Sequence, residues 1–190
     1  MDMRKVVAAI NMTLDGFCDH TAIDPDEEIH QHYTKLLRNA DAILYGRITY
    51  ELMTYWQTFL KEPSGEKQMN DFAIAIDTIP KIVFSHTLED VNWESAQIAD
   101  LDIKEVVLEL RQQSGKDVLV GSRSLIIQLM QLNFIDEYQI CVHPVVAGKG
   151  LPLFQKISDK TNLKLLKTKL FGSGAVILYY ERAKPEHNRH

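Results

Sequence analysis

The feature that most constrains the fold is a short buried strand that breaks at a glycine and continues directly as an amphipathic helix. In residues 117–133, DVLVGSRSLIIQLMQLN, the apolar run ends at Gly121, and apolar residues then return at the i, i+1, i+4 and i+7 positions of one helical stripe. Residues 41–56 have the same pattern, with Gly46 at the turn. The unpaired N–H groups of a helix start suit an anion, although many turns of this kind only connect two elements.

Further apolar runs predict additional strands. Residues 4–10 and 81–84 are too short for a helix of average length and read as buried strands, and residues 93–96 are a candidate for another. The polar segment 61–67 reads as a solvated loop within one domain, because it spans only a few residues.

Two helix starts carry capping signals. Asp24 as N-cap, Pro25 at the first helical position and Glu27 at the third predict one start, and Asp102 with Glu105 predicts another. The apolar stripe expected for the first of these helices is Ile29, Tyr33, Leu36 and Leu37, and that for the second is Ile103, Val106, Val107 and Leu110.

The last third of the sequence changes character. Residues 135–146, 163–171 and 175–180 are rich in β-forming residues, and Gly-Ser-Gly at 172–174 predicts the turn of a hairpin between the last two. Strands that alternate with helices and then follow one another directly imply a mainly parallel sheet with an antiparallel C-terminal edge. The predicted class is therefore α/β.

Composition narrows the function. With 190 residues, 45% of them hydrophobic, the chain is expected to form a single domain over residues 1–183, followed by a frayed polar tail at 184–190. A net charge of -5 argues against a nucleic-acid surface. Cys18 and Cys141 share no metal-ligand or disulfide spacing, so we expect no metal site. We find neither a signal peptide nor a membrane-spanning stretch in the sequence, so we expect a cytoplasmic protein.

Four loops should meet at the carboxyl edge of this sheet, where ligands bind in open parallel sheets. They are residues 11–17, 46–49, 85–87 and 121–124. The two glycine turns each carry an arginine within two residues, and Arg47 can bind a phosphate through two parallel hydrogen bonds. Two such turns suit a ligand with several phosphates, and a dinucleotide fits better than a single phosphate. Alternatively, Arg47 pairs with Glu51 as a surface ion pair of small energy.

The order of these segments carries a family resemblance. RKVVAAINMTLDGF, ILYGRITYE, KIVFSHT, VLVGSRSLIIQLM and DEYQICVHPVVAGKGLPLF, followed by a final hairpin, resemble the dihydrofolate-reductase-like superfamily. The branch that looks most similar contains the reductase domain of the bifunctional riboflavin-biosynthesis deaminase/reductase and stand-alone bacterial homologues. The resemblance implies a three-layer α/β/α fold with NADPH across the carboxyl edge of the sheet.

The resemblance also implies a cofactor site. Arg47 would lie near the 2′-phosphate and the pyrophosphate, and the turn that begins at Gly121 would wrap the pyrophosphate. The family more often has a pair of glycines here, where this chain has Gly121 and Ser122. The cofactor residues that the resemblance implies are Gly16, Gly46, Arg47, Thr49, Ser85, His86, Gly121, Ser122, Arg123 and Ser124.

A substrate would lie next to the nicotinamide. The resemblance implies that residues 11–17 close over that ring, with Asp15 as the candidate for orienting the substrate or relaying a proton. The carboxylate of dihydrofolate reductases falls near His30 here, which argues against dihydrofolate as the substrate. Tyr33 reads as core or pocket wall, and His143 reads as a packed histidine. The substrate contacts implied are Asn11, Phe17, Glu27, His30 and Tyr50.

The expected activity is NADPH-dependent hydride transfer to a C=N or C=O bond of a small pteridine- or pyrimidine-like heterocycle. One alternative is an activity like that of the 5-amino-6-(5-phosphoribosylamino)uracil reductase of riboflavin biosynthesis. Another is a non-catalytic NADPH-binding protein. The β-rich C-terminal third also predicts a homodimer, because long apolar edge strands are normally covered.

Overall fold

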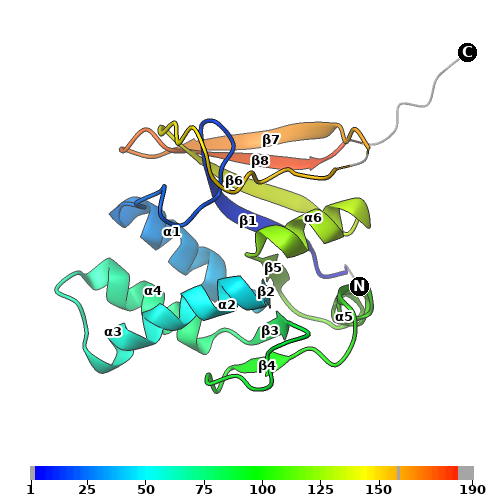
Figure 1. The fold of residues 1–190 in the computed structure, drawn as a ribbon, viewed down its shortest axis with the longest axis horizontal. Helices are drawn as coiled ribbons and strands as arrows, with labels where there is room; N and C mark the ends of the chain where they lie inside the picture. The colour runs from blue at the N-terminus through cyan, green and yellow to red at the C-terminus, as the bar shows by residue number, and fades with distance from the viewer. Residues whose placement is uncertain (1–2, 158, 184–190) are drawn as a thin grey trace, which may run out of the picture.

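A mixed sheet of eight strands forms the centre of the protein in the computed structural model, which describes residues 3–157 and 159–183 (Figure 1). The order of the strands across the sheet is β4-β3-β2-β5-β1-β6-β8-β7. The strands are β1 (Val6–Thr13), β2 (Ala40–Gly46), β3 (Lys81–Phe84), β4 (Ala96–Ile98), β5 (Asp117–Val120), β6 (Glu137–His143), β7 (Leu163–Leu170) and β8 (Val176–Arg182). The first six in the spatial order run parallel, whereas β8 is antiparallel to β6 and β7 is antiparallel to β8. This confirms the α/β class with its antiparallel C-terminal edge.

Helices cover both faces of the sheet and complete the three layers (Figure 1). They are α1 (Glu27–Arg38), α2 (Arg47–Met53), the 3₁₀ helix η1 (Thr54–Gln57), α3 (Thr58–Lys61), α4 (Lys67–Thr78), α5 (Ile103–Gln112) and α6 (Arg123–Gln131). α5 and α6 bury their apolar stripes against one face of the sheet, and α1 and α4 bury theirs against the other. Alternate side chains of each strand supply the two cores, since neighbouring residues of a strand point to opposite faces.

Three details differ from the sequence-based expectation. α1 begins two residues later than predicted, because the Asp26 carboxylate, rather than that of Asp24, accepts from the N–H of Ile29 at 2.9 Å. β4 occupies Ala96–Ile98 instead of 93–96, because Trp93 is buried in the core before the strand begins. The sequence does not predict helix α4, because its apolar residues form an almost continuous run and not a helical stripe. The capping box of Asp102 with Glu105 is present as predicted.

Each parallel strand ends at the same edge of the sheet, so the loops after β1, β2, β3, β5 and β6 gather there. The predicted tail at 184–190 lies outside the described residues. We find no helix within residues 3–157 and 159–183 with the length and apolar character needed to cross a bilayer.

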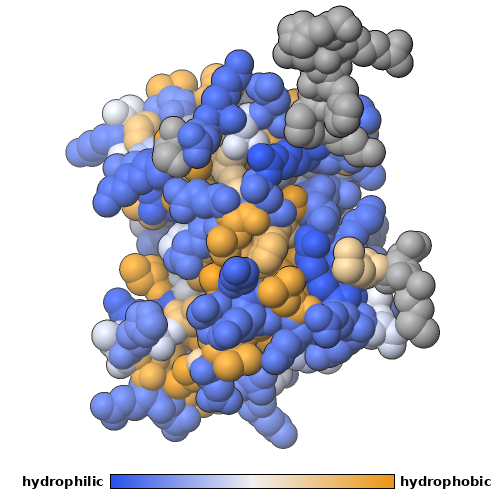
Figure 2. All heavy atoms as spheres, turned by 90° about the vertical axis from the view of Figure 1, so that its right-hand side faces the viewer, coloured by the Kyte–Doolittle hydropathy of each residue, from blue (hydrophilic) through white to orange (hydrophobic). Residues whose placement is uncertain are grey.

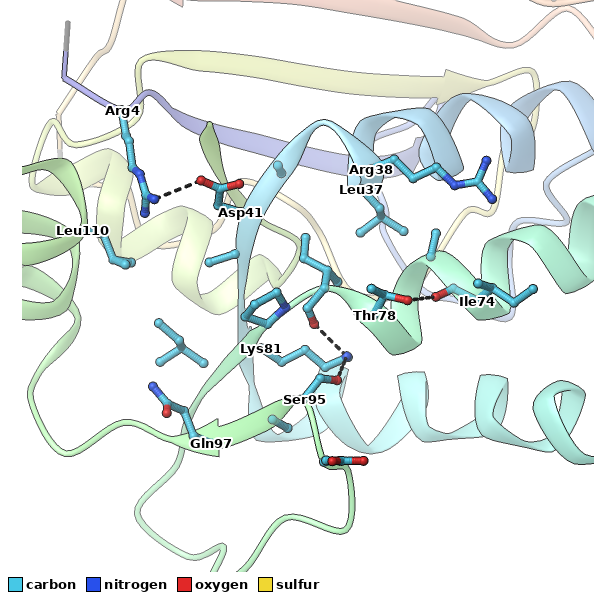
Figure 3. Close-up of a pocket in the computed structure, with 18 of the residues that line it drawn as sticks. Arg4, Leu37, Arg38, Asp41, Ile74, Thr78, Lys81, Ser95, Gln97 and Leu110 are labelled. Carbon is cyan, nitrogen blue, oxygen red and sulfur yellow. Dashed lines mark hydrogen bonds and ion pairs between the residues drawn. The ribbon is translucent and has the colours of Figure 1, made fainter. Parts of the chain in front are cut away.

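The opposite, amino-end edge carries a hollow of about 830 Å³ between the starts of β2, β3 and β4 (Figure 3). Its polar groups are engaged with one another: Arg4 pairs with Asp41 at 2.9 Å, and the fully buried Lys81 donates to Ser95 Oγ at 2.6 Å. Figure 2 shows apolar atoms reaching the surface amid hydrophilic ones on the side of the molecule where the N-terminus lies. The hollow therefore lies at the opposite edge of the sheet from the predicted cofactor loops.

Candidate functional site

The two glycine turns lie side by side at the carboxyl edge. The backbone N–H of Gly46, at the end of β2, donates to Ser122 Oγ at the start of α6 with an N···O distance of 2.8 Å. A Cβ on Gly46 would sit 3.2 Å from Ser124 Oγ, so this turn has little room for a side chain. The prediction that these two turns converge is confirmed.

The start of α6 has an unusual capping arrangement. Ser122 is the N-cap residue, but its side chain makes no cap hydrogen bond and instead accepts from Gly46. The first N–H groups of α6 therefore lack the oxygen that a serine N-cap normally supplies. Such a helix start favours an anion, both through its free donors and through its positive dipole end.

Gly121 has a packing role that the sequence did not suggest. A Cβ there would lie 2.9 Å from Tyr45 Cε1, and Tyr45 is buried. Glycine is thus required at this position so that β5 can pack against the Tyr45 ring, whether or not an anion approaches the backbone.

Both predicted phosphate-binding arginines have partners in this structure. Arg47 forms an exposed ion pair with Glu51, with N···O distances of 2.9 and 3.0 Å. Arg123 donates from Nε to the carbonyl of Pro152 at 2.6 Å and from its terminal nitrogen to Gln155 at 2.9 Å. Arg123 thereby ties the segment after β6 to the start of α6, a contact that the sequence did not reveal.

The remaining predicted cofactor residues lie around the same edge. Gly46 is in register with Phe84, so Ser85 follows β3 next to the Gly46 turn. Ser85 Oγ accepts from the N–H groups of Thr87 and Leu88 at 3.1 and 2.9 Å, which closes a tight turn. His86 is exposed and Thr49 is half-buried.

Asp15 holds two loops together. Its carboxylate accepts from Thr13 Oγ1 at 2.6 Å and from the backbone N–H groups of Gly148 and Ala147 at 2.7 and 3.1 Å. The hydrogen bond from Thr13 and the two backbone donors lower the pKa of Asp15 to about 2. A carboxyl group of that pKa is a poor proton donor near neutral pH, so the geometry favours a clamp over the predicted proton relay.

The loop after β1 is fastened to the segment after β6 along its length. Gly16, with φ of 93°, accepts from the N–H of Leu153 at 2.9 Å, and Phe17 forms an isolated bridge with Pro152. The two segments build one wall at the carboxyl ends of β1 and β6. The sequence predicted the position of this loop but not the segment that supports it.

Asn11 belongs to a hydrogen-bond network that sequence reasoning missed. Tyr33 in α1 donates its hydroxyl to Asn11 Oδ1 at 3.1 Å, and His143 Nε2 lies 3.0 Å from the same oxygen. Burial lowers the pKa of His143, which is 5% exposed. The network depends on the register that sets β1 beside β6, and a single sequence gives no signal of that register.

Three further predicted substrate contacts lie on α1 and α2. Tyr50 is 3% exposed and packs against Trp93, so its ring lies in the core, and its contact with a substrate stays a prediction. His30 is half-buried, and its ring meets Trp56 and Phe72 edge to face. Glu27 is exposed and accepts from Gln31 at 2.9 Å.

A comparison with known protein families fits this arrangement. The family model described as the RibD C-terminal domain matches residues 4–177. The chain belongs to this family. Protein YyaP of Bacillus subtilis (strain 168), an uncharacterized relative, is 33% identical over 188 residues, which cover 95% of this chain and 96% of YyaP.

Solved structures show the same fold for the RibD C-terminal domain of this chain. A protein from Shewanella sp. PV-4 assigned to riboflavin biosynthesis has a TM-score of 0.71 at 17% identity, over 95% of this chain and 99% of that one. Dihydrofolate reductase from Enterococcus faecalis, solved with NADP(H), has a TM-score of 0.63 at 13% identity, over 95% of this chain and 97% of that one. The dihydrofolate-reductase-like fold is confirmed.

The residues at the carboxyl edge fit a phosphorylated dinucleotide. The start of α6 lacks a side-chain cap, the Gly46 turn packs directly against Ser122 and Ser124, and Arg47 is exposed next to them. Clusters of three or more His, Cys, Asp or Glu side chains suited to a metal ion are absent from the described part of the chain.

Proposed function

We propose that this protein is an NADPH-dependent reductase that acts on a small pteridine- or pyrimidine-like heterocycle. When bound, the cofactor supplies a hydride to the carbon of a C=N or C=O bond, and a proton is added to the nitrogen or oxygen. The protein's part is to hold the cofactor at the carboxyl edge, to orient the flat substrate beside it and to exclude water.

The observation that carries the proposal is the hydrogen bond between Gly46 and Ser122. It joins the ends of β2 and β5 at 2.8 Å and turns the Ser122 hydroxyl away from the α6 N–H groups. Two neighbouring turns then offer donors to one ligand, and a pyrophosphate is the anion whose length suits a pair of adjacent turns.

Arg47 supports the same assignment through its present partner. Its ion pair with Glu51 is exposed on both sides, with side-chain exposures of 42% and 48%. Exposed pairs of this kind are worth about 0–1 kcal/mol, so Arg47 can exchange the carboxylate for a phosphate at little cost. A doubly charged 2′-phosphate would make the stronger pair, which predicts a preference for NADPH over NADH.

The test is a titration of the purified protein with NADPH and with NADH, followed by fluorescence. We expect NADPH to bind at least about tenfold more tightly, and Arg47→Ala to remove most of that difference, since one charge-assisted hydrogen bond is worth roughly 1.5–3 kcal/mol. Arg38→Ala is the matched control, because Arg38 is exposed at the opposite edge of the sheet. If neither NADPH nor NADH binds, the proposal is rejected.

Two other functions share this cofactor site. A reductase of 5-amino-6-(5-phosphoribosylamino)uracil is favoured by the family match to the RibD C-terminal domain. A non-catalytic NADPH-binding protein is favoured if NADPH binds but its absorbance stays constant with the uracil substrate, with pterins and with small carbonyl compounds. The compound with which NADPH is consumed, if there is one, distinguishes these three functions.

We also propose that the protein forms a homodimer through its C-terminal strands. β7 is an edge strand, and Leu165, Leu166 and Leu170 on it are 49%, 43% and 72% exposed. Exposed apolar edge strands are normally covered. Light scattering should give twice the chain mass, and a monomer at micromolar concentration would reject the dimer.

A further inference from the structure

We propose that Asn11 turns its amide N–H groups toward the substrate and selects flat heterocycles that present a carbonyl oxygen to it. This inference rests on the proposed function, because it names the class of substrate that the same site accepts. It is carried by the hydrogen-bond network of Asn11, Tyr33 and His143.

The network fixes which end of the Asn11 amide is buried. Tyr33 and His143 both approach Oδ1, at 3.1 and 3.0 Å. Burial raises the pKa of Tyr33 well above its ordinary value, so its hydroxyl keeps a proton that needs an acceptor. The amide NH₂ group has no lone pair to accept that proton, whereas the amide oxygen has two. The oxygen therefore faces Tyr33, and His143 completes the pair by donating from Nε2.

The other end of the amide remains available. Asn11 Nδ2 makes no hydrogen bond within residues 3–157 and 159–183, and it is absent from the buried polar atoms without partners in that part of the chain. It is accordingly open to solvent. Asn11 as a whole is partly buried, so a ligand at this position would replace water on the NH₂ group alone.

The location agrees with the proposed substrate site. Asn11 stands near the carboxyl end of β1, on the sheet face that α1 covers, since Tyr33 of α1 reaches it. It lies two residues before Thr13, whose hydroxyl donates to the Asp15 clamp. A heterocycle between α1 and the loop after β1 would therefore meet the amide.

The acidic groups at the start of α1 are already engaged. Asp26 caps the helix, Glu27 accepts from Gln31, and Glu28 accepts from the N–H of Gly172 at 2.8 Å. Each of them therefore already accepts a hydrogen bond from within the protein. The amide of Asn11 adds a free donor to this region, and it favours ligands that accept.

The experiment compares two ligands that differ in the group at C4 and, with it, in whether N3 carries a proton. 2-Amino-4-oxopteridine carries a carbonyl oxygen where 2,4-diaminopteridine carries an amino group, and each is titrated into the protein saturated with NADPH. We expect the oxo compound to bind at least about tenfold more tightly, because a donor facing a donor leaves both without a partner.

Asn11→Asp is the decisive variant. A carboxylate of the same shape still accepts from Tyr33 and His143, but its second oxygen accepts where the amide donated, so the preference should reverse toward the diamino compound. Asn162→Asp is the matched control, because it makes the same change of charge at an exposed residue beside the start of β7. Tyr33→Phe should shrink the preference, since it frees the amide to turn.

The outcomes separate this inference from the proposed function. Failure of the wild type to bind NADPH overturns both. Binding of NADPH with the same pteridine preference in Asn11→Asp and wild type, or with no pteridine binding, overturns the role of Asn11 alone. If Asn11→Asp does not fold by circular dichroism, Tyr33→Phe decides: a reduced preference supports the role, and an unchanged one overturns it.

Discussion

Replacing Lys81 by methionine should change how the stability of this protein depends on pH. Lys81 begins β3, is 0% exposed and donates from Nζ to the carbonyls of Ile79 and Asp77 at 2.9 and 3.2 Å and to Ser95 Oγ at 2.6 Å. Its ammonium group also lies 4.0 Å from the centre of the Trp93 ring. Together these contacts join the end of α4 to β3 and to the segment before β4.

The expected size of the effect follows from the pKa. Burial lowers the pKa of Lys81 from 10.5 to about 8, and the charge of Asp77 offsets only part of this. Between these two values the unfolded chain binds more protons than the folded protein, so the free energy of unfolding rises with pH through that window. At about 1.4 kcal/mol for each pH unit of separation, the full effect is roughly 3 kcal/mol.

Urea unfolding of the wild type and of Lys81→Met, from about pH 7 to about pH 10, measures this contribution. The difference in unfolding free energy, wild type minus variant, should grow by roughly 2–3 kcal/mol in favour of the wild type over that range. Ionisation of tyrosines affects both proteins and cancels in the difference. Lys104→Met, at an exposed lysine of α5, should show no such slope. Parallel curves for wild type and Lys81→Met would refute the reasoning.

Three further predictions concern the carboxyl edge. Glu51→Gln should tighten NADPH binding severalfold in a fluorescence titration, because it removes the carboxylate that competes for Arg47; weaker binding would contradict this. Asp15→Asn should allow limited proteolysis of the two loops at a lower temperature, since Asp15 clamps them together. The pH profile of any turnover should stay unchanged, and a shifted profile would support Asp15 as a proton relay. Gly121→Ala should cost about 1–3 kcal/mol in urea unfolding, because the new Cβ would lie 2.9 Å from the Tyr45 ring, whereas Gly65→Ala, in open space, should not.

Local signals explain why much of the fold could be predicted. The strand-glycine-helix pattern at Gly46 and Gly121 depends on residues a few positions apart, as does the capping box of Asp102. Helix α4 has no such signal. The side chain of its N-cap residue Glu66 makes no cap hydrogen bond, and its buried residues Ala73, Ala75 and Ile76 sit in an almost unbroken apolar run. Where periodicity and capping are both weak, packing against α1 decides the structure.

The candidate site divides in the same way. The sequence identified the loops, because any chain of parallel strands delivers its carboxyl ends to one edge. It did not reveal the partners: Arg123 binds the carbonyl of Pro152, 29 residues away, and Asp15 binds Gly148, 133 residues away. Those contacts depend on how two loops without regular structure settle against each other, and residue types alone do not encode that.

By itself, the sequence determined the α/β class, the antiparallel C-terminal edge and the meeting of the Gly46 and Gly121 turns, since each follows from hydrophobic periodicity and strand order. Only the tertiary structure decided that Tyr50 belongs to the core, that Asp15 is a clamp and that Asn11 shares its oxygen between Tyr33 and His143. The physical reason is distance along the sequence. Periodicity depends on residues a few positions apart, whereas the hydrogen-bond partners of these side chains lie 22 to 133 residues away and are set by strand register and by how the loops pack.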